Sequence, residues 1–249
     1  MNVTVCIKRV PDTETRIRID QSGSDIDTTG VKYIISPYDE FAIEAGLRVR
    51  EAVGEGEVCV VTFGEPAGQE TLRAGLAMGA DRAVLLKGAS DMDGLATAKV
   101  LAAHLEDTGS DLVLFGVKAA DDDLQQVGPM VGTLLGRPCV TGVASFEVSD
   151  GKAMCHREIE GGVEVVEVVL PAVLSITKGE FEPRYASLKG IMAAKRKPLE
   201  EKDAVPAASR VRIRSLSEPP PRAPGRIVGE GPDAVPELVR VLREEANAL

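Results

Sequence analysis

The stretch that decides the fold is Asp111-Leu-Val-Leu-Phe-Gly-Val-Lys-Ala-Ala-Asp-Asp-Asp-Leu-Gln-Gln-Val-Gly-Pro-Met130. It opens with a continuous apolar run, Leu112–Phe115, which is typical of a buried strand. The run breaks at Gly116, and a helix-compatible pattern begins at about Leu124. In an α/β sheet such a loop lies at the carboxyl end of a strand, where unpaired N–H groups of the next helix can hold an anion. The stretch therefore gives the hypothesis of a nucleotide-binding site, although taken alone it fits an ordinary turn between strand and helix better.

Three consecutive aspartates in this stretch, Asp121, Asp122 and Asp123, leave two other interpretations open. In an ordinary turn they would cap the following helix and complement its dipole. Clustered carboxylates are also the ligands that magnesium prefers. Acids at a helix start are usually caps, so a metal site is not predicted.

The composition limits the classes of partner. The 249 residues carry a formal net charge of −10, which argues against nucleic acid or an anionic membrane as the main partner. Aromatic residues make up only 3% of the chain, so stacking platforms for single-stranded nucleic acid are not expected. The charge is uneven, because ten Lys/Arg between Arg184 and Arg222 accompany four Asp/Glu, which gives +6 there and −16 elsewhere. This later segment is expected to face a different partner.

Cysteine, histidine and hydropathy patterns set further limits. The four cysteines form no C-x-x-C pair and the only histidines are His104 and His156, which argues against a zinc site. The sequence begins without a charged leader and has no apolar run of membrane-spanning length. We therefore expect a cytoplasmic protein without membrane insertion.

Apolar runs and helical patterns alternate through the first 135 residues. This alternation predicts a parallel sheet with helices on both faces, whose ligand crevice gathers the loops near Lys8, Ser36, Phe63 and Gly116. The expected strands are Val3–Ile7, Val58–Phe63, Ala83–Leu86 and Leu112–Phe115, and the expected helices are Ser36–Val53, Thr71–Met78 and Gly94–Leu105.

The start of the first helix carries its own signals. Ser36 is a suitable cap and Pro37 suits the first helical position. Asp39 stands where the acid of a capping box belongs, so a reciprocal pair of side-chain bonds with Ser36 is expected.

After Pro138 the pattern changes to short runs joined by hairpin signals, which predict an antiparallel addition. These runs are Val143–Val148, Lys152–Ile159, Val163–Leu170 and Val173–Thr177. A short basic helix is expected at Ile191–Lys197, an extended and poorly packed arm at 198–225, and an amphipathic helix at Pro232–Ala246. The chain is thus expected to divide into an α/β body, 1–197, and a C-terminal arm, 198–249.

Signatures of self-contained catalysis are missing. No G-x-x-x-x-G-K-[ST] loop occurs, and no G-x-G-x-x-G follows a strand. Neither histidine lies near a Ser or Cys motif, so a nucleophile–base pair is hard to assemble. The sequence favours a binding protein with no catalytic residue of its own.

Several stretches together resemble the β subunit of electron transfer flavoproteins, in the right order and over nearly the whole chain. Cys155 departs from the small aliphatic residue usual in that family's hairpin. The stretches are Lys8–Asp12, Ser36–Glu40, Gln69–Arg82, Gly116–Met130, Arg157–Glu164, Leu170–Val173 and Pro183–Met192.

The resemblance implies a Rossmann-like fold of the adenine-nucleotide-hydrolase type and a heterodimer. In that family an α subunit holds the redox FAD, while β buries AMP or, in electron-bifurcating members, a second FAD. Electrons pass from acyl-CoA or other flavin dehydrogenases to a quinone reductase. Matched motif by motif, the nucleotide contacts would be Cys6, Ser36, Pro37, Tyr38, Asp39, Phe63, Gly116, Val117, Lys118, Ala119, Ala120, Asp121, Asp122, Asp123, Leu124, Gln125, Gln126 and Val127.

Features of the loop point both ways on the identity of the nucleotide. Asp122 adds bulk and charge where bifurcating relatives tend to have glycine, which favours AMP. The stretches Gln126–Pro129 and Gly225–Glu230 resemble the bifurcating branch, so FAD with NADH oxidation is the alternative. Val127 replaces a threonine common in AMP-type relatives, which removes one hydroxyl contact and leaves the backbone donor.

The resemblance also implies partner contacts. Leu188 matches a leucine that inserts into a dehydrogenase, and Tyr185, Ile191 and Met192 share its segment, Pro183–Met192. Glu158 matches an acid that orients the flavin domain of α, and the arm would wrap α. From the residues alone, Leu188 could instead pack inside and Glu158 could be an ordinary surface acid.

The same body also suits a protein of another class, a stand-alone adenine-nucleotide-binding module without a redox role. The antiparallel addition and the long arm favour the subunit of a complex, because a lone module has little use for either. Thr13 replaces an aromatic residue of some relatives, so flavin contact is not expected there.

Overall fold

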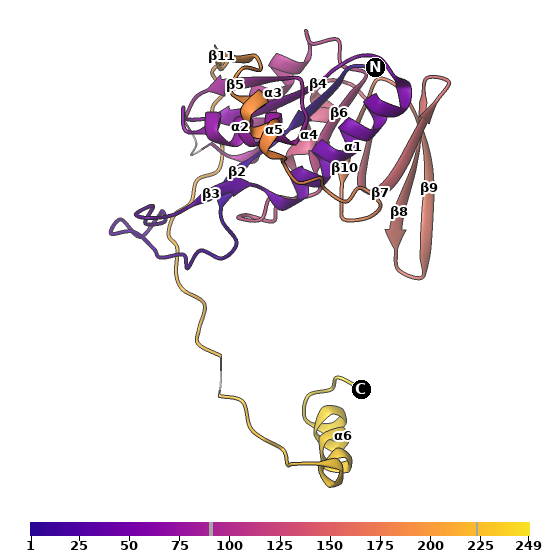
Figure 1. The fold of residues 1–249 in the computed structure, drawn as a ribbon. Coiled ribbons are helices and arrows are strands. Elements are labelled where there is room, and N and C mark those ends of the chain that lie inside the picture. The colour runs from indigo at the N-terminus through magenta and orange to yellow at the C-terminus, as the bar shows by residue number, and fades with distance from the viewer. Residues whose placement is uncertain (90–91, 223) are drawn as a thin grey trace.

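A mostly parallel sheet forms the centre of the computed structural model, which describes residues 1–89, 92–222 and 224–249 (Figure 1). Its strands follow the order β11-β5-β4-β1-β6-β10-β7-β8-β9. The predicted α/β class is confirmed. The strands are β1 (Val3–Cys6), β4 (Val58–Gly64), β5 (Arg82–Lys87), β6 (Leu112–Gly116), β7 (Cys139–Ser149), β8 (Lys152–Ile159), β9 (Gly162–Val169), β10 (Ala172–Ile176) and β11 (Leu199–Asp203).

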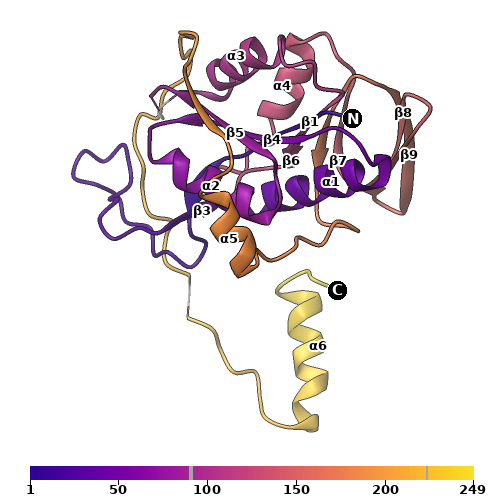
Figure 2. The same ribbon diagram turned by 45° about the horizontal axis from the view of Figure 1, so that its top comes forward.

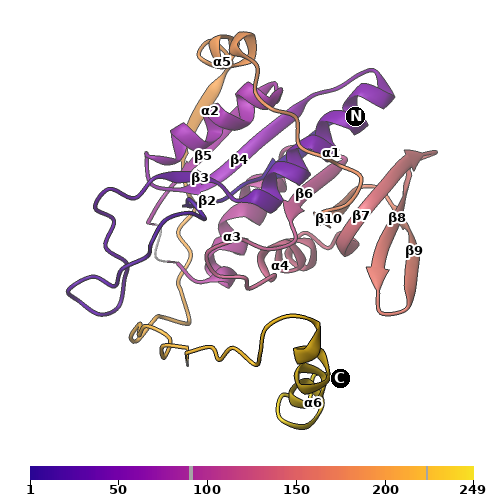
Figure 3. The ribbon, with the colours of Figure 1, turned by 60° about the horizontal axis from the view of Figure 1, so that its bottom comes forward.

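Helices cover both faces of this sheet, as Figure 3 shows. Helices α1 (Pro37–Val53), α2 (Gly68–Met78) and α5 (Leu188–Ala194) lie on one face, and α3 (Gly94–Leu105) and α4 (Val127–Leu134) lie on the other. Successive strand residues point to opposite faces, so Val5 packs under α1 and α2 while its neighbour Cys6 joins the cluster under α3 and α4. Nearly every residue of β1, β4 and β6 is buried, which explains their continuous apolar runs.

The antiparallel part is smaller than predicted. Strands β7, β8 and β9 pair antiparallel, as expected for runs joined by hairpins. The run Val173–Thr177 was predicted to belong with them, and that prediction is wrong. It forms β10, which is fully buried and inserts between β6 and β7, parallel to both. A five-residue apolar run suits the centre of a parallel sheet better than a half-exposed hairpin.

The C-terminal segment begins inside the sheet. Residues 199–203, predicted as part of a poorly packed arm, form β11 and pair parallel with β5. Beyond this strand Ala204 and Ala207 pack against the body, and hydrogen bonds hold the chain further along. The Asp93 carboxylate accepts the N–H groups of Arg210 and Val211 at 2.5 and 2.8 Å, and Leu216 N–H donates to Gly23 O at 2.8 Å.

Two short helices near the C-terminus lie close to their predicted places. Helix α5 begins at Leu188, three residues before the predicted start. A 3-10 turn, η1 (Pro232–Ala234), leads into α6 (Val235–Glu244), which stands away from the body in Figure 2 and has no buried residue. No helix in the described ranges is long and apolar enough to cross a membrane.

A two-stranded ribbon projects from the carboxyl end of β1. Strands β2 (Arg9–Pro11) and β3 (Tyr33–Ile35) pair antiparallel, and the excursion between them is closed by an isolated bridge from Ile19 to Ile26. The Arg9 guanidinium stacks over the Tyr33 ring at 3.5 Å. The ribbon thereby places a wall beside the strand ends.

Candidate functional site

A cavity of about 530 Å³ opens where the carboxyl ends of β1, β4 and β6 meet. This is the edge at which parallel sheets usually bind ligands. Of the residues predicted as nucleotide contacts, those that line the cavity are Cys6, Asp39, Phe63, Gly116, Val117, Lys118, Ala119, Asp121, Asp122, Leu124, Gln125, Gln126 and Val127. Ser36, Pro37, Tyr38, Ala120 and Asp123 do not line it.

Gly116 lines the cavity where the end of β6 meets the start of α1. A Cβ atom there would stand 2.5 Å from Asp39 Oδ1 and 2.7 Å from the Tyr38 carbonyl carbon. The missing side chain lets the end of β6 and the start of α1 touch. Asp39 joins three segments across this contact, because its carboxylate accepts the Gly116 N–H at 2.9 Å and the Lys8 N–H at 2.7 Å.

These contacts replace the predicted capping box, which does not form. Asp39 is occupied by the ends of β1 and β6, and the Ser36 N–H donates instead to Lys8 O at 2.9 Å. The Ser36 hydroxyl makes no cap bond and accepts the Ala120 N–H at 3.3 Å. Pro37 holds the first helical position as predicted. Ser36 therefore supports the loop from behind the cavity wall.

The loop over the cavity is held by two lysines. Lys8 Nζ lies 2.8 Å from both Asp121 Oδ1 and Asp122 Oδ2, and Lys118 Nζ lies 2.8 Å from Asp123 Oδ2. The three aspartates therefore pair with lysines and do not cap the next helix. That helix, α4, begins at Val127 rather than Leu124 and has no side-chain cap bond.

Burial dominates the titration of Asp39. The carboxyl lies away from water, which raises its pKa to about 7 although the Lys8 and Gly116 N–H groups favour the charged form. A group whose pKa rises on folding holds a proton that the unfolded chain has already released. The ordinary pKa of an aspartate is about 4. Between that pH and the folded pKa of about 7, the contribution of Asp39 to the unfolding free energy therefore falls as the pH rises.

The Asp39→Asn variant isolates this effect, because asparagine does not titrate. We expect the unfolding free energy of the wild-type chain, relative to that of the variant, to decrease as the pH rises through this interval. Urea denaturation of both chains at several pH values measures the difference. Parallel pH curves would show that Asp39 keeps an ordinary pKa.

Several cavity residues were not predicted from the sequence. The loop near Lys8 was expected at the crevice, but Lys8 itself was not among the predicted contacts, although it is a cation directly after a buried strand, at the edge that also carries three acids. The others come from segments that fold over the cavity, and no local pattern marks them. They include Arg9, Ile26 and Tyr33 from the ribbon, Thr62 and Ser175 from strands, and Met92, Thr97 and Leu101 from the α3 region.

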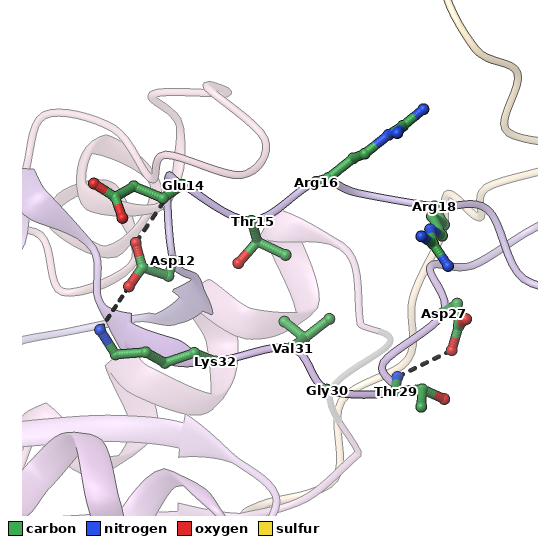
Figure 4. Close-up of a pocket in the computed structure, with 10 residues that line it drawn as sticks. All are labelled: Asp12, Glu14, Thr15, Arg16, Arg18, Asp27, Thr29, Gly30, Val31 and Lys32. Atoms are coloured by element: carbon green, nitrogen blue, oxygen red, sulfur yellow. Dashed lines mark hydrogen bonds and ion pairs between the residues drawn. The ribbon is translucent and has the colours of Figure 1, made fainter.

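A second hollow of about 480 Å³ lies in the excursion, and Figure 4 shows its lining. Its polar groups bond to one another, with Lys32 Nζ 2.8 Å from Asp12 Oδ2 and the Thr29 N–H 3.0 Å from Asp27 Oδ1. Arg16 points away from these bonds in the same view, whereas Arg18 extends toward Asp27. The hollow has no apolar wall comparable to that of the first cavity, which is the better candidate site.

Comparison with known proteins agrees with this geometry. The electron transfer flavoprotein domain family matches residues 24–207. Electron transfer flavoprotein subunit beta of Syntrophomonas wolfei is 40% identical over 233 residues, covering 94% of this chain and 92% of that protein. The subunits beta of Bradyrhizobium diazoefficiens and Bacillus subtilis are 38% and 37% identical over the full length of both chains. The chain belongs to the electron transfer flavoprotein β-subunit family.

The segment predicted to contact partners, Pro183–Met192, lies on the α1 and α2 face of this electron transfer flavoprotein chain, away from the cavity. Tyr185 is 99% exposed and Leu188 is 84% exposed, and Ile191 and Met192 are also exposed. The alternative that Leu188 packs inside the body is therefore wrong. An exposed apolar cluster of this kind is typical of an interaction site.

Glu158 lies on the outer antiparallel part of the sheet. It is exposed on β8 and pairs in register with Val163 of β9. Val163 and Val165 share its face and are more than half exposed. The acid thus stands beside an uncovered apolar strip at the edge of the sheet.

Proposed function

We propose that this chain is the β subunit of a heterodimeric electron transfer flavoprotein. It would carry electrons from acyl-CoA or other flavin dehydrogenases to a quinone reductase. AMP would occupy the cavity, and the redox FAD would be held mainly by the α subunit. One observation supports this proposal most directly. A single cavity is lined by the loops after β1, β4 and β6 and by the start of α1, and these are the segments in which the family resemblance implies nucleotide contacts.

The chemistry of the cavity suits a nucleotide. Cys6 and Phe63 contribute apolar surface to the cavity wall. Burial raises the pKa of the Cys6 thiol, so this group stays neutral. The first-turn N–H groups of α4 have no partner within the helix and can receive a phosphate. Lysines 8 and 118 pair with the three loop aspartates and reduce their net charge from −3 to −1, which lowers the repulsion that a phosphate would otherwise meet.

The choice of AMP rests on Asp122. Its side chain lines the cavity, where it takes up space and adds charge. A second FAD in this subunit, with NADH oxidation, is the alternative that the Gln126–Pro129 stretch favours. FAD supplies the redox chemistry when bound, and the residues of this chain bind the nucleotide, shape its cavity and present the docking surfaces.

Two surfaces would serve the partners. Glu158 and the neighbouring apolar strip, together with the arm that ends in α6, would contact the α subunit. Pro183–Met192 would dock flavin dehydrogenases through Leu188. Burying one leucine contributes about 1.5–3 kcal/mol, which suits brief docking followed by release. A stand-alone nucleotide-binding module would use neither surface.

Nucleotide analysis of the assembled protein tests this function. The chain is co-expressed with an α subunit, and the purified complex is denatured so that the released nucleotides can be identified and counted. We expect one AMP for each FAD. Two FAD and no AMP would indicate the bifurcating alternative. Failure of the chain to form a complex, with adenine nucleotide bound to it alone, would support the stand-alone module.

A further inference from the structure

The exposed segment 185–192 has little packing of its own, yet its C-terminal side is firmly fixed to α2. Arg73 Nη1 donates to Ala194 O at 2.6 Å and to Lys197 O at 2.8 Å. Lys197 Nζ donates to Ala80 O at 2.5 Å. A Cβ atom at Gly190 would lie 2.5 Å from Ala77 O, so α5 sits directly on the end of α2.

Its N-terminal side follows the buried Phe181 and is held to α1 by Arg184. The guanidinium Nε lies 2.7 Å from Glu44 Oε2, and Nη1 lies 2.7 Å from Glu51 Oε1. Nη2 reaches the second oxygen of each acid at 3.1 Å, and the Arg184 N–H also donates to Glu44 at 3.3 Å. Such paired, charge-assisted bonds restrict both distance and orientation.

Glu44 gives this contact its strength. Its side chain is only 3% exposed, and Arg48 Nε also binds it, at 2.7 Å. Burial disfavours the charged carboxylate, but the bonds from Arg184 and Arg48 together hold the pKa of Glu44 below its usual range. Removing an arginine from a buried carboxylate is strongly destabilising, because the buried negative charge then loses a partner.

We propose that Arg184 is a positioning residue that fixes segment 185–192 on α1 in the orientation in which it docks a flavin dehydrogenase. This inference rests on the proposed docking function of that segment. A segment fixed before encounter loses less conformational entropy on binding. Leu188 makes the contact, and Arg184 determines where Leu188 stands.

The test uses the complex with the α subunit and compares Arg184→Ala with Arg196→Ala. Arg196 carries the same charge at the exposed end of α5 and has no side-chain hydrogen bond or ion pair in the described chain. Hydrogen exchange measures the mobility of segment 185–192. Steady-state kinetics with an acyl-CoA dehydrogenase as electron donor measure docking. We expect Arg184→Ala to raise both exchange and KM by roughly tenfold with kcat little changed, and Arg196→Ala to change neither.

Further variants separate positioning from folding and from contact. Arg184→Lys and Glu51→Gln each keep part of the network, so we expect them to raise hydrogen exchange and KM by smaller factors. These two variants replace Arg184→Ala in the test if that variant fails to fold. In a Leu188→Ala background, Arg184→Ala should raise KM less than it does alone. Unchanged exchange in every Arg184 variant that folds would overturn the inference. If Leu188→Ala left KM unchanged, the proposed docking function itself would be refuted.

Discussion

Replacing Gly116 by alanine is expected to lower the unfolding free energy by about 3 kcal/mol, the upper end for an overpacked core position. The added Cβ would meet Asp39 Oδ1 at 2.5 Å and the Asp39 backbone nitrogen at 2.8 Å. Backbone atoms cannot rotate away, so α1 must move from the end of β6. The movement breaks the Gly116 N–H bond to Asp39. Urea denaturation measures the loss of stability, and nucleotide analysis of the purified complex measures the expected loss of AMP.

A second glycine controls for the substitution itself. Gly162 begins β9, is exposed, and has no atom within 4 Å of the position of an added Cβ. Gly162→Ala is expected to change the unfolding free energy by no more than about 0.5 kcal/mol. A Gly116→Ala chain that unfolds like the control and keeps its nucleotide would refute the close contact between β6 and α1.

The central strands could be predicted from the sequence almost to the residue, because burial on both faces leaves a local signal. The run Leu112–Phe115 needs no knowledge of its neighbours to be read as a strand. The position of a strand within the sheet cannot be predicted in this way, because it depends on residues far away in the sequence. Val173–Thr177 looks like the runs before it, but its partners in the sheet are β6 and β7. Their mostly apolar composition suits a buried strand, but nothing within those five residues specifies the strands with which they pair.

Charged and capping residues were harder to place, because their partners are distant in the sequence. Asp39 has the spacing of a capping box, yet it accepts N–H groups from residues 31 and 77 positions away. The three aspartates of the loop have the composition of a helix cap, yet two of them pair with Lys8, more than 100 positions away. Local rules describe what such residues do when no tertiary partner competes.

The short strand β11 was missed for a related reason. Leu199–Asp203 is exposed at most positions and carries four charges, which is a pattern of loops and linkers. It forms a strand because β5 offers a free edge to pair with. Charged edge strands of this kind also protect a sheet from pairing with other molecules.

Removal of residues 198–249 is therefore expected to do more than detach an arm. The shortened chain loses β11, whose register runs from Leu199 opposite Ala83 to Asp203 opposite Lys87. The buried, apolar strand β5 would then become an open edge that can pair with other chains. We expect the protein that ends at residue 197 to aggregate or to unfold about 6–12 °C lower, as a loss of about 3 kcal/mol implies at this chain length. Light scattering and thermal unfolding provide the measurements.

A chain that ends at residue 231 separates the two parts of this C-terminal segment. It keeps β11 and the bonds of Asp93 to Arg210 and Val211, and it loses only η1 and α6, which bury no residue. Its thermal unfolding should match that of the full chain, while its binding to the α subunit should weaken because the apolar face of α6 is gone. Equal stability of both shortened chains would mean that β11 contributes nothing to the body. Weaker α binding by the chain that ends at residue 231, with its thermal unfolding unchanged, would locate a partner contact in the last eighteen residues. The C-terminal segment thus begins by completing the fold, and we propose that its end offers a surface to the α subunit.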